Sequence, residues 1–301
     1  DAPDEATAAQ LVSTTQVFWQ VGVFISFICA FLVSAMQGAT GGRVVFAILA
    51  VFAVIAWLWR LLSPTFRRFH EAADVRDAAR PAVVGNGKVS VTKVLFGADK
   101  KVLLTYFLAI VIFYVGWNLL ANTWGQFQTY MFSKAGAAQS LATGLGIILN
   151  FVTLVLNIVF ASIAGGKYRN KAFFAGIVIS LIAMAAMAMG GADLWVIVGA
   201  TAFMNLGSPL AGEALYKVWT QESFPIEIRA SIQGFINGFS RLCCGLFALI
   251  TPALVLPETI QTTMWCFFGI VIIEGIAGTI MIRAQKKYGT DEERQAHKIA
   301  A

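Results

Sequence analysis

Amide side chains recur at helical spacing within long apolar stretches of the chain. Three of them follow one another at intervals of four residues and two are seven residues apart, so each group shares one face of a helix. An amide offers both hydrogen-bond donors and an acceptor, which suits a neutral ligand with many hydroxyl groups. Any single amide can equally join two membrane helices, but for the whole set we expect a solvated cavity. The set comprises Asn118, Asn122, Gln126, Asn150, Asn157, Asn205 and Asn237.

Charged side chains are rarer in these stretches. Glu213 and Lys217 have the i,i+4 spacing at which helical side chains can pair. Arg241 and Glu274 each lie near the middle of an apolar stretch, where an unpaired charge is costly. We therefore expect Arg241 to pair with Glu213 or Glu274, and we favour a structural pair over direct contact with substrate. Proton coupling through Glu213 or Glu274 is a less favoured alternative.

The sequence holds no pattern typical of a metal centre or of catalysis. Its four cysteines and two histidines have no metal-ligand spacing, and no phosphate-binding loop, HExxH motif or nucleophile–histidine arrangement occurs. We expect no metal, no cofactor and no enzymatic activity.

The composition identifies the elements that must position these side chains. Of the 301 residues, 58% are hydrophobic and only 13% are charged, which excludes a soluble enzyme, a nucleic-acid-binding protein and a disordered chain. Crossing a bilayer takes about 20 mostly apolar residues in a helix. Eight stretches meet this length, at 17–36, 44–62, 102–120, 141–165, 172–190, 194–219, 230–254 and 264–282.

The distribution of basic residues fixes the orientation of the eight stretches. If the N-terminus is cytoplasmic, the inner segments carry 18 of the 22 Lys and Arg residues and the outer segments carry only Arg43 and Lys134. Cytoplasmic segments of membrane proteins have this excess of basic residues. We therefore expect a multi-pass protein of the cytoplasmic membrane with both termini and the long polar loop 63–101 on the cytoplasmic side.

The order of the stretches, two before the long loop and six after it, predicts the domain organisation. The expected units are the end of an N-terminal bundle at 1–62, a central cytoplasmic loop at 63–101, a six-helix bundle at 102–283 and a cytoplasmic tail at 284–301. The chain starts at Asp1 with sixteen polar and acidic residues. On this basis we expect preceding helices to be missing, the alternative being a complete eight-helix protein.

Residues 212–234 read GEALYKVWTQESFPIEIRASIQG. This segment resembles the tenth helix of the sugar porters of the major facilitator superfamily, whose E-x-F-P-x-x-x-R signature is matched by Glu222, Phe224, Pro225 and Arg229. The YKVWTQE sequence before it is similar to the bacterial inositol-transporter branch. The loop GGKYRNK at 165–171 is basic, as in the family, but lacks its usual acidic residue.

The resemblance implies an all-α integral membrane protein that works by alternating access of two six-helix bundles. It implies secondary transport of a sugar or polyol, myo-inositol first among them, driven by protons through an acidic residue on a first helix that this chain lacks. Glu222 and Arg229 would belong to a cytoplasmic charge network that controls gating. The expected partners are the substrate, protons and lipid, with no nucleic acid. The alternative is a transporter of the same superfamily for an organic acid or a drug.

Overall fold

The computed structural model describes residues 4–33, 36, 40–64, 67–68, 71, 91–191, 193–254, 256 and 258–300. Within these ranges every regular element is a helix, which confirms the all-α prediction. Most of the predicted loop 63–101 lies outside the described residues. Its described end carries the short helix α4 (Val91–Leu95).

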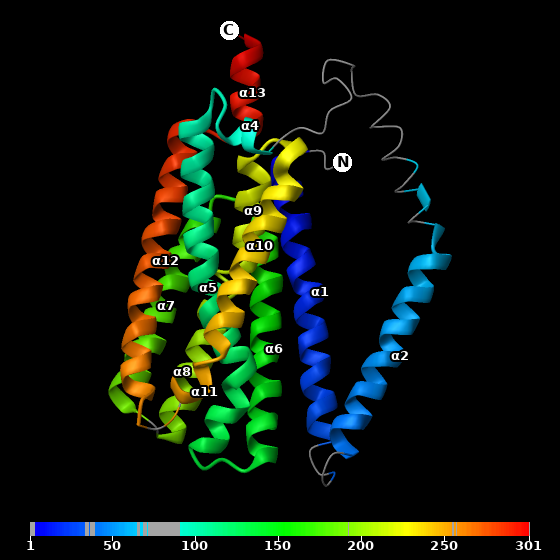
Figure 1. Ribbon diagram of the computed structural model, residues 1–301, viewed down its shortest axis with the longest axis vertical. Helices are drawn as coiled ribbons and strands as arrows, with labels where there is room; N and C mark the ends of the chain where they lie inside the picture. The colour runs from blue at the N-terminus through cyan, green and yellow to red at the C-terminus, as the bar shows by residue number, and fades with distance from the viewer. Residues whose placement is uncertain are drawn as a thin grey trace.

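The long helices run side by side along the long axis of the molecule (Figure 1). Their bounds differ from the predicted stretches mainly by extending into the flanking polar residues. The helices are α1 (Glu5–Leu32), α2 (Thr40–Leu62), α5 (Lys100–Lys134), α6 (Gln139–Ile163), α7 (Arg169–Gly190), α8 (Leu194–Gly207), α9 (Glu213–Ser223), α10 (Ile226–Ala248), α11 (Thr251–Leu254), α12 (Ile260–Tyr288) and α13 (Asp291–Ala300).

Helix α1 begins twelve residues before its predicted apolar stretch. Asp4 caps it, because its side chain accepts a hydrogen bond of 2.7 Å from the backbone N–H of Thr7. The helix then lies along α6 (Figure 1). Glycines permit this close approach: a Cβ at Gly146 would collide with the ring of Phe27, and a Cβ at Gly165 with the backbone of Ala6.

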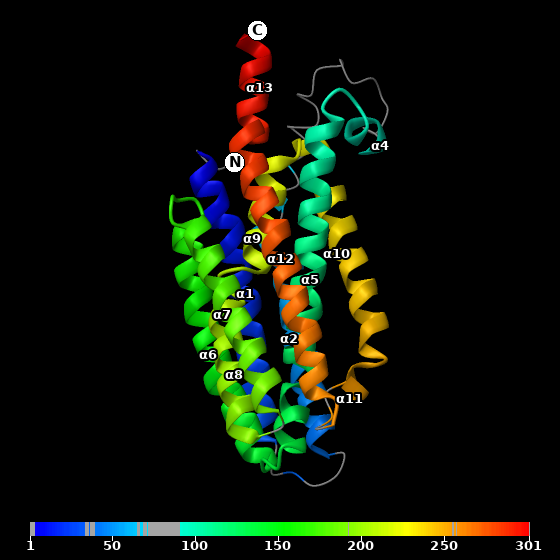
Figure 2. The same cartoon turned by 90° about the vertical axis from the view of Figure 1, so that its left-hand side faces the viewer.

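Helix α2 diverges from the other helices in Figure 1, and in the view of Figure 2 it lies behind them. None of its most apolar window is buried inside the protein, and its large side chains, such as Trp57 and Trp59, are exposed. An apolar helix with an uncovered surface fits a lipid environment.

The predicted stretch 194–219 is not one helix. Helix α8 ends at Gly207 and α9 begins at Glu213, with Pro209 between them. Proline has no N–H to continue the helical hydrogen bonds, and close packing fixes the break, since a Cβ at Gly207 would collide with Ser180. A break of this kind is common where a membrane helix lines a cavity.

Six helical segments among the described residues are long and apolar enough to cross a membrane. They are Glu5–Leu32, Thr40–Leu62, Lys100–Thr123, Ser140–Ile163, Arg169–Gly190 and Ile260–His297. Helix α8 is shorter than these, and α10 has 23 residues but carries more polar side chains. The protein is thus a multi-pass membrane protein, and the count of eight membrane helices remains a prediction.

Tight contact between α7 and α12 gives the first testable prediction. A Cβ at Gly278 would collide with the ring of Phe173, which is fully buried against Trp219 and Phe113. We expect Gly278→Ala to lower the unfolding free energy by about 1–3 kcal/mol, the usual cost of overpacking. Thermal unfolding in detergent measures this. Gly269→Ala, in the same helix with no atom within 4 Å of the new Cβ, is the control and should unfold like the parent protein.

Candidate functional site

A cavity of about 370 Å³ lies among helices α1, α5, α6, α8, α9 and α10. Its walls combine apolar side chains, including Trp19, Phe27, Trp117 and Met204, with amides and two charged groups. This mixture is typical of small-molecule sites, where apolar walls exclude water and a few polar groups fix orientation. The polar side chains that line it are Gln16, Gln20, Asn118, Asn122, Gln128, Asn150, Thr153, Asn157, Asn205, Ser208, Glu213 and Arg241.

Five of the seven predicted amides line this cavity, namely Asn118, Asn122, Asn150, Asn157 and Asn205. Asn237 is not among the described residues that line it, and its amide nitrogen lies 3.5 Å from the hydroxyl of Tyr114. The side chain of Gln126 lies outside the described residues. Amides of three helices, α5, α6 and α8, thus lie around one cavity. Their role in binding a ligand stays a prediction.

The amides of α5 form a hydrogen-bonded chain to α10. The Asn118 side-chain nitrogen donates to the hydroxyl of Ser240, which is fully buried. Asn122 donates in turn to the side-chain oxygen of Asn118 at 2.6 Å and to its backbone carbonyl at 2.8 Å. This chain fixes the orientation of both amides before any ligand arrives, which lowers the ordering cost of binding.

The amides of α6 and α8 are also held by their neighbours. The side-chain oxygen of Asn205 accepts a 2.6 Å hydrogen bond from the hydroxyl of Thr153, and its nitrogen donates to the backbone carbonyl of Thr201 at 2.8 Å. The nitrogens of Asn150 and Asn157 donate to backbone carbonyls one turn earlier on α6. These bonds join α6 to α8 and keep the amide groups at the cavity wall.

The sequence analysis missed the contribution of α1. Gln16 and Gln20 line the cavity and are nearly fully buried, and Gln20 donates to the side-chain oxygen of Asn150 at 3.1 Å. A signal was present, because the two glutamines have the same i,i+4 spacing that marked the α5 amides. It was overlooked because Gln16 falls just outside the predicted apolar stretch.

The expected pairing of Arg241 with Glu213 or Glu274 is wrong. Glu213 pairs with Lys217 at 3.1 Å, which the i,i+4 spacing allowed. Glu274 is buried on α12 next to Gly116 and is not among the described residues that line the cavity. Arg241 instead lines the cavity and donates to the side-chain oxygen of Asn122 at a long 3.4 Å.

Lys217 connects the cavity to α1. Its ammonium group lies 3.2 Å from the side-chain oxygen of Gln16 and 3.5 Å from the hydroxyl of Thr15. Because Glu213 and Gln16 both line the cavity, this one cation joins two cavity residues from different parts of the chain.

Removing this cation gives a second prediction. Lys217→Met leaves the nearly buried carboxylate of Glu213 without its partner, so we expect a loss of about 1–3 kcal/mol in unfolding free energy. Thermal unfolding in detergent measures it. Glu213→Gln combined with Lys217→Met removes both charges and should recover most of the loss. Equal destabilisation in the single and double variants would contradict the ion-pair explanation.

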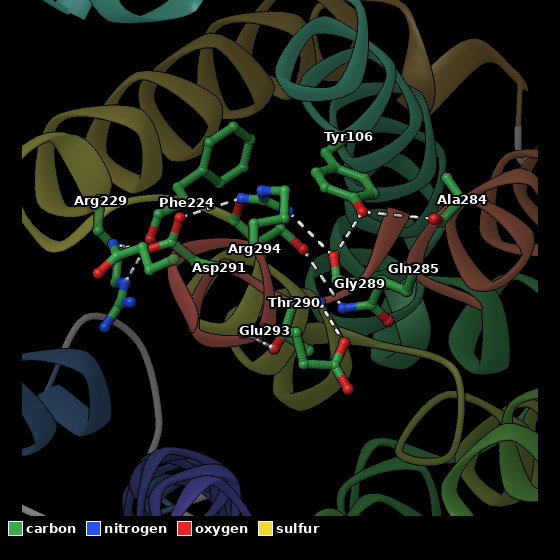
Figure 3. Close-up of polar contacts among 12 residues, drawn as sticks. Tyr106, Phe224, Arg229, Ala284, Gln285, Gly289, Thr290, Asp291, Glu293 and Arg294 are labelled. Carbon is green, nitrogen blue, oxygen red and sulfur yellow. Dashed lines mark hydrogen bonds and ion pairs between the residues drawn. The ribbon is translucent and has the colours of Figure 1, made fainter. Parts of the chain in front are cut away.

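A second polar cluster lies at the end of the bundle that carries both chain termini. Glu222 binds the guanidinium of Arg169, at 2.5 Å and 3.0 Å, and accepts a further 3.1 Å hydrogen bond from Gln285. The family signature directed attention to Arg229 as the other member of this network. The Nε of Arg229 instead donates to the backbone carbonyl of Phe224 at 3.1 Å (Figure 3). The partner of Glu222 is thus Arg169, which sequence analysis placed only in a basic loop.

Helix α13 fastens this cluster to the turn between α9 and α10. Arg294 donates to the backbone carbonyls of Ser223 at 2.8 Å and Gly289 at 3.0 Å, and it pairs with Asp291 at 3.1 Å (Figure 3). Burial raises the pKa of the Asp291 carboxyl, and the nearby Arg294 and Arg229 oppose this rise. The turn that carries the family signature is therefore held by α7, α12 and α13 together.

Long apolar helices around a cavity define a multi-pass membrane protein. The chain is 25% identical over 285 residues to the minor myo-inositol transporter IolF of Bacillus subtilis (strain 168). The match covers 90% of this chain and 61% of the relative, so the chain spans about three fifths of the relative's length. No protein-family model matches the chain. The match confirms the resemblance to bacterial inositol transporters of the major facilitator superfamily, and this relative is a transporter, not an enzyme.

Proposed function

We propose that the protein transports a sugar or polyol, myo-inositol foremost, across the cytoplasmic membrane by alternating access. The observation that carries this proposal is the cavity, where five asparagines and three glutamines from α1, α5, α6 and α8 converge. Side-chain amides pair well with hydroxyl groups because they donate and accept at once. The relative's name supports the same substrate class.

The proposal includes the predicted organisation of the chain. Residues 1–62 are the end of an N-terminal bundle, 63–101 a cytoplasmic loop, 102–283 a C-terminal six-helix bundle and 284–301 a cytoplasmic tail. In this arrangement α8 and α9 together form one broken membrane helix, which with α10 completes the count of eight. The contact of α1 with α6 and α9 then lies between the two bundles, where alternating access requires contacts to open and close.

The orientation can be tested by labelling single cysteines in the complete protein. We expect Lys134→Cys to react with a membrane-impermeant thiol reagent from outside, and Lys286→Cys only after the membrane is opened. The 18-to-2 division of basic residues motivates this expectation. A background variant without the four native cysteines serves as the control. Labelling of both positions from the same side would contradict the topology.

Uptake by the complete protein tests the function. We expect proteoliposomes to accumulate labelled myo-inositol in preference to a panel of neutral hexoses, and a protonophore to abolish accumulation if protons drive it. Empty liposomes and a variant with the cavity blocked, Asn205→Trp, are the controls. Absence of saturable uptake for every polyol in the panel would refute the proposal.

The second candidate is a transporter of the same superfamily for an organic acid. Arg241 favours it, because anion carriers place a cation in the cavity and Arg241 lines this one.

A further inference from the structure

Arg241 is a cation in the cavity wall without a carboxylate partner among the described parts of the chain. Ion pairs among those residues join Arg169 to Glu222, Lys217 to Glu213 and Arg294 to Asp291. The second carboxylate near mid-membrane, Glu274, is buried on α12 away from the cavity lining.

The guanidinium of Arg241 has donor capacity left over. It carries five N–H donors in a planar fork, and one of them makes the 3.4 Å contact with Asn122. The side chain is exposed instead of packed under a neighbouring helix, and it lines the cavity. Since Asn122 is itself fixed by Asn118, the amide chain of α5 orients the guanidinium toward a defined place at the wall.

The charge balance of the cavity points the same way. Glu213 also lines it, but Lys217 neutralises that carboxylate at 3.1 Å. The described lining therefore carries a net positive charge at Arg241. A planar guanidinium matches a carboxylate with two parallel hydrogen bonds, which a neutral hydroxyl cannot reproduce.

We propose that Arg241 is a specificity-determining residue that binds the carboxylate of a hydroxylated acid, so that the cavity prefers a sugar acid over the neutral sugar of the same shape. This inference rests on the proposed function and names its substrate class more closely. The acid's hydroxyl groups would meet the amides of α6 and α8, and its carboxylate would meet Arg241.

The experiment compares D-glucuronate with D-glucose, because the two rings differ only in a carboxylate in place of a hydroxymethyl group. Binding to the complete purified protein is measured by the ligand-induced rise in melting temperature, which does not depend on transport. We expect glucuronate to bind about tenfold or more tightly than glucose at neutral pH, where the carboxylate is ionised.

Two variants assign the preference to the guanidinium. Arg241→Gln keeps polar donors without the charge and should lower the ratio of glucuronate to glucose affinity about tenfold. Arg241→Lys keeps the positive charge but replaces the planar guanidinium by an ammonium group. It should retain only part of the preference for glucuronate over glucose. Lys134→Gln removes a cation outside the cavity and should leave the ratio unchanged.

The outcomes separate this inference from the proposed function. Equal affinity of the parent protein for glucuronate and glucose would overturn the inference about Arg241. An Arg241→Gln variant that binds both ligands more weakly to the same extent would also overturn it, because that pattern indicates a structural role. Failure of myo-inositol uptake alone would refute only the proposed function, since the affinity ratio does not use transport.

Discussion

Replacing Asn118 by leucine should reduce polyol uptake by the complete protein at least tenfold. Asn118 is 1% exposed, and its amide links the fully buried hydroxyl of Ser240 to the side chain of Asn122. Leucine keeps the branching of asparagine at Cγ but is larger and has neither donor nor acceptor, so the substitution removes these hydrogen bonds. Each buried polar group left unpaired costs about 1–3 kcal/mol, and about 1.4 kcal/mol corresponds to tenfold in affinity.

The measurement is initial uptake rate against substrate concentration, at matched amounts of protein in the membrane. We expect the substitution to change mainly the apparent affinity for the substrate, because the α5 amide chain forms part of the cavity wall. Gln261→Leu, an exposed amide on α12, is the matched control and should behave like the parent. Uptake by Asn118→Leu within a factor of two of the parent would show that this amide only joins helices.

The convergence of the amides could be predicted because their spacing is a local property. Helical periodicity placed Asn118 and Asn122 on one face, and any packing of that face toward the bundle interior brings them to a common space. The same i,i+4 spacing holds for Gln16 and Gln20, of which only Gln16 lies outside the predicted stretch 17–36. The all-helical architecture followed from composition alone, since a chain in lipid must satisfy its backbone hydrogen bonds internally.

The charge pairs could not be predicted in the same way. Lys217 is one helical turn from Glu213, so their spacing predicts that they can pair. Arg169 and Glu222 are 53 residues apart, so spacing predicts nothing about their pairing. Only the packing of α7 beside α12 and α8, with Phe173 of α7 against Trp219 of α9, brings the start of α7 to the end of α9. Family signatures direct attention to residues close in sequence, and this is why Arg229 was favoured over Arg169. The break near Pro209 could be predicted from the sequence, because a proline interrupts the hydrogen bonds of a helix.

The position of Arg169 yields the last prediction, which concerns gating. Side-chain exposures of 16% and 10% show that the Arg169–Glu222 pair is mostly shielded from water. Removing one partner of such a pair costs about 3–5 kcal/mol when fully buried, and less at this partial exposure. We expect Arg169→Ala to abolish most net uptake of the proposed substrate, and Arg229→Ala to have a smaller effect, because the structure gives Arg229 one side-chain hydrogen bond, to the carbonyl of Phe224.

Uptake and ligand-induced melting shifts should be measured on the same protein preparations. The cluster lies at the end of the bundle that carries α13, away from the cavity lining, so ligand binding by Arg169→Ala should persist while uptake falls. Arg169→Lys keeps one charge-assisted contact and should recover part of the uptake. Glu222→Gln with Arg169→Ala removes the stranded carboxylate and should recover stability without recovering uptake. If Arg229→Ala proves as damaging as Arg169→Ala, the network is centred on the signature arginine after all, and the ion pair with α7 is only a structural contact.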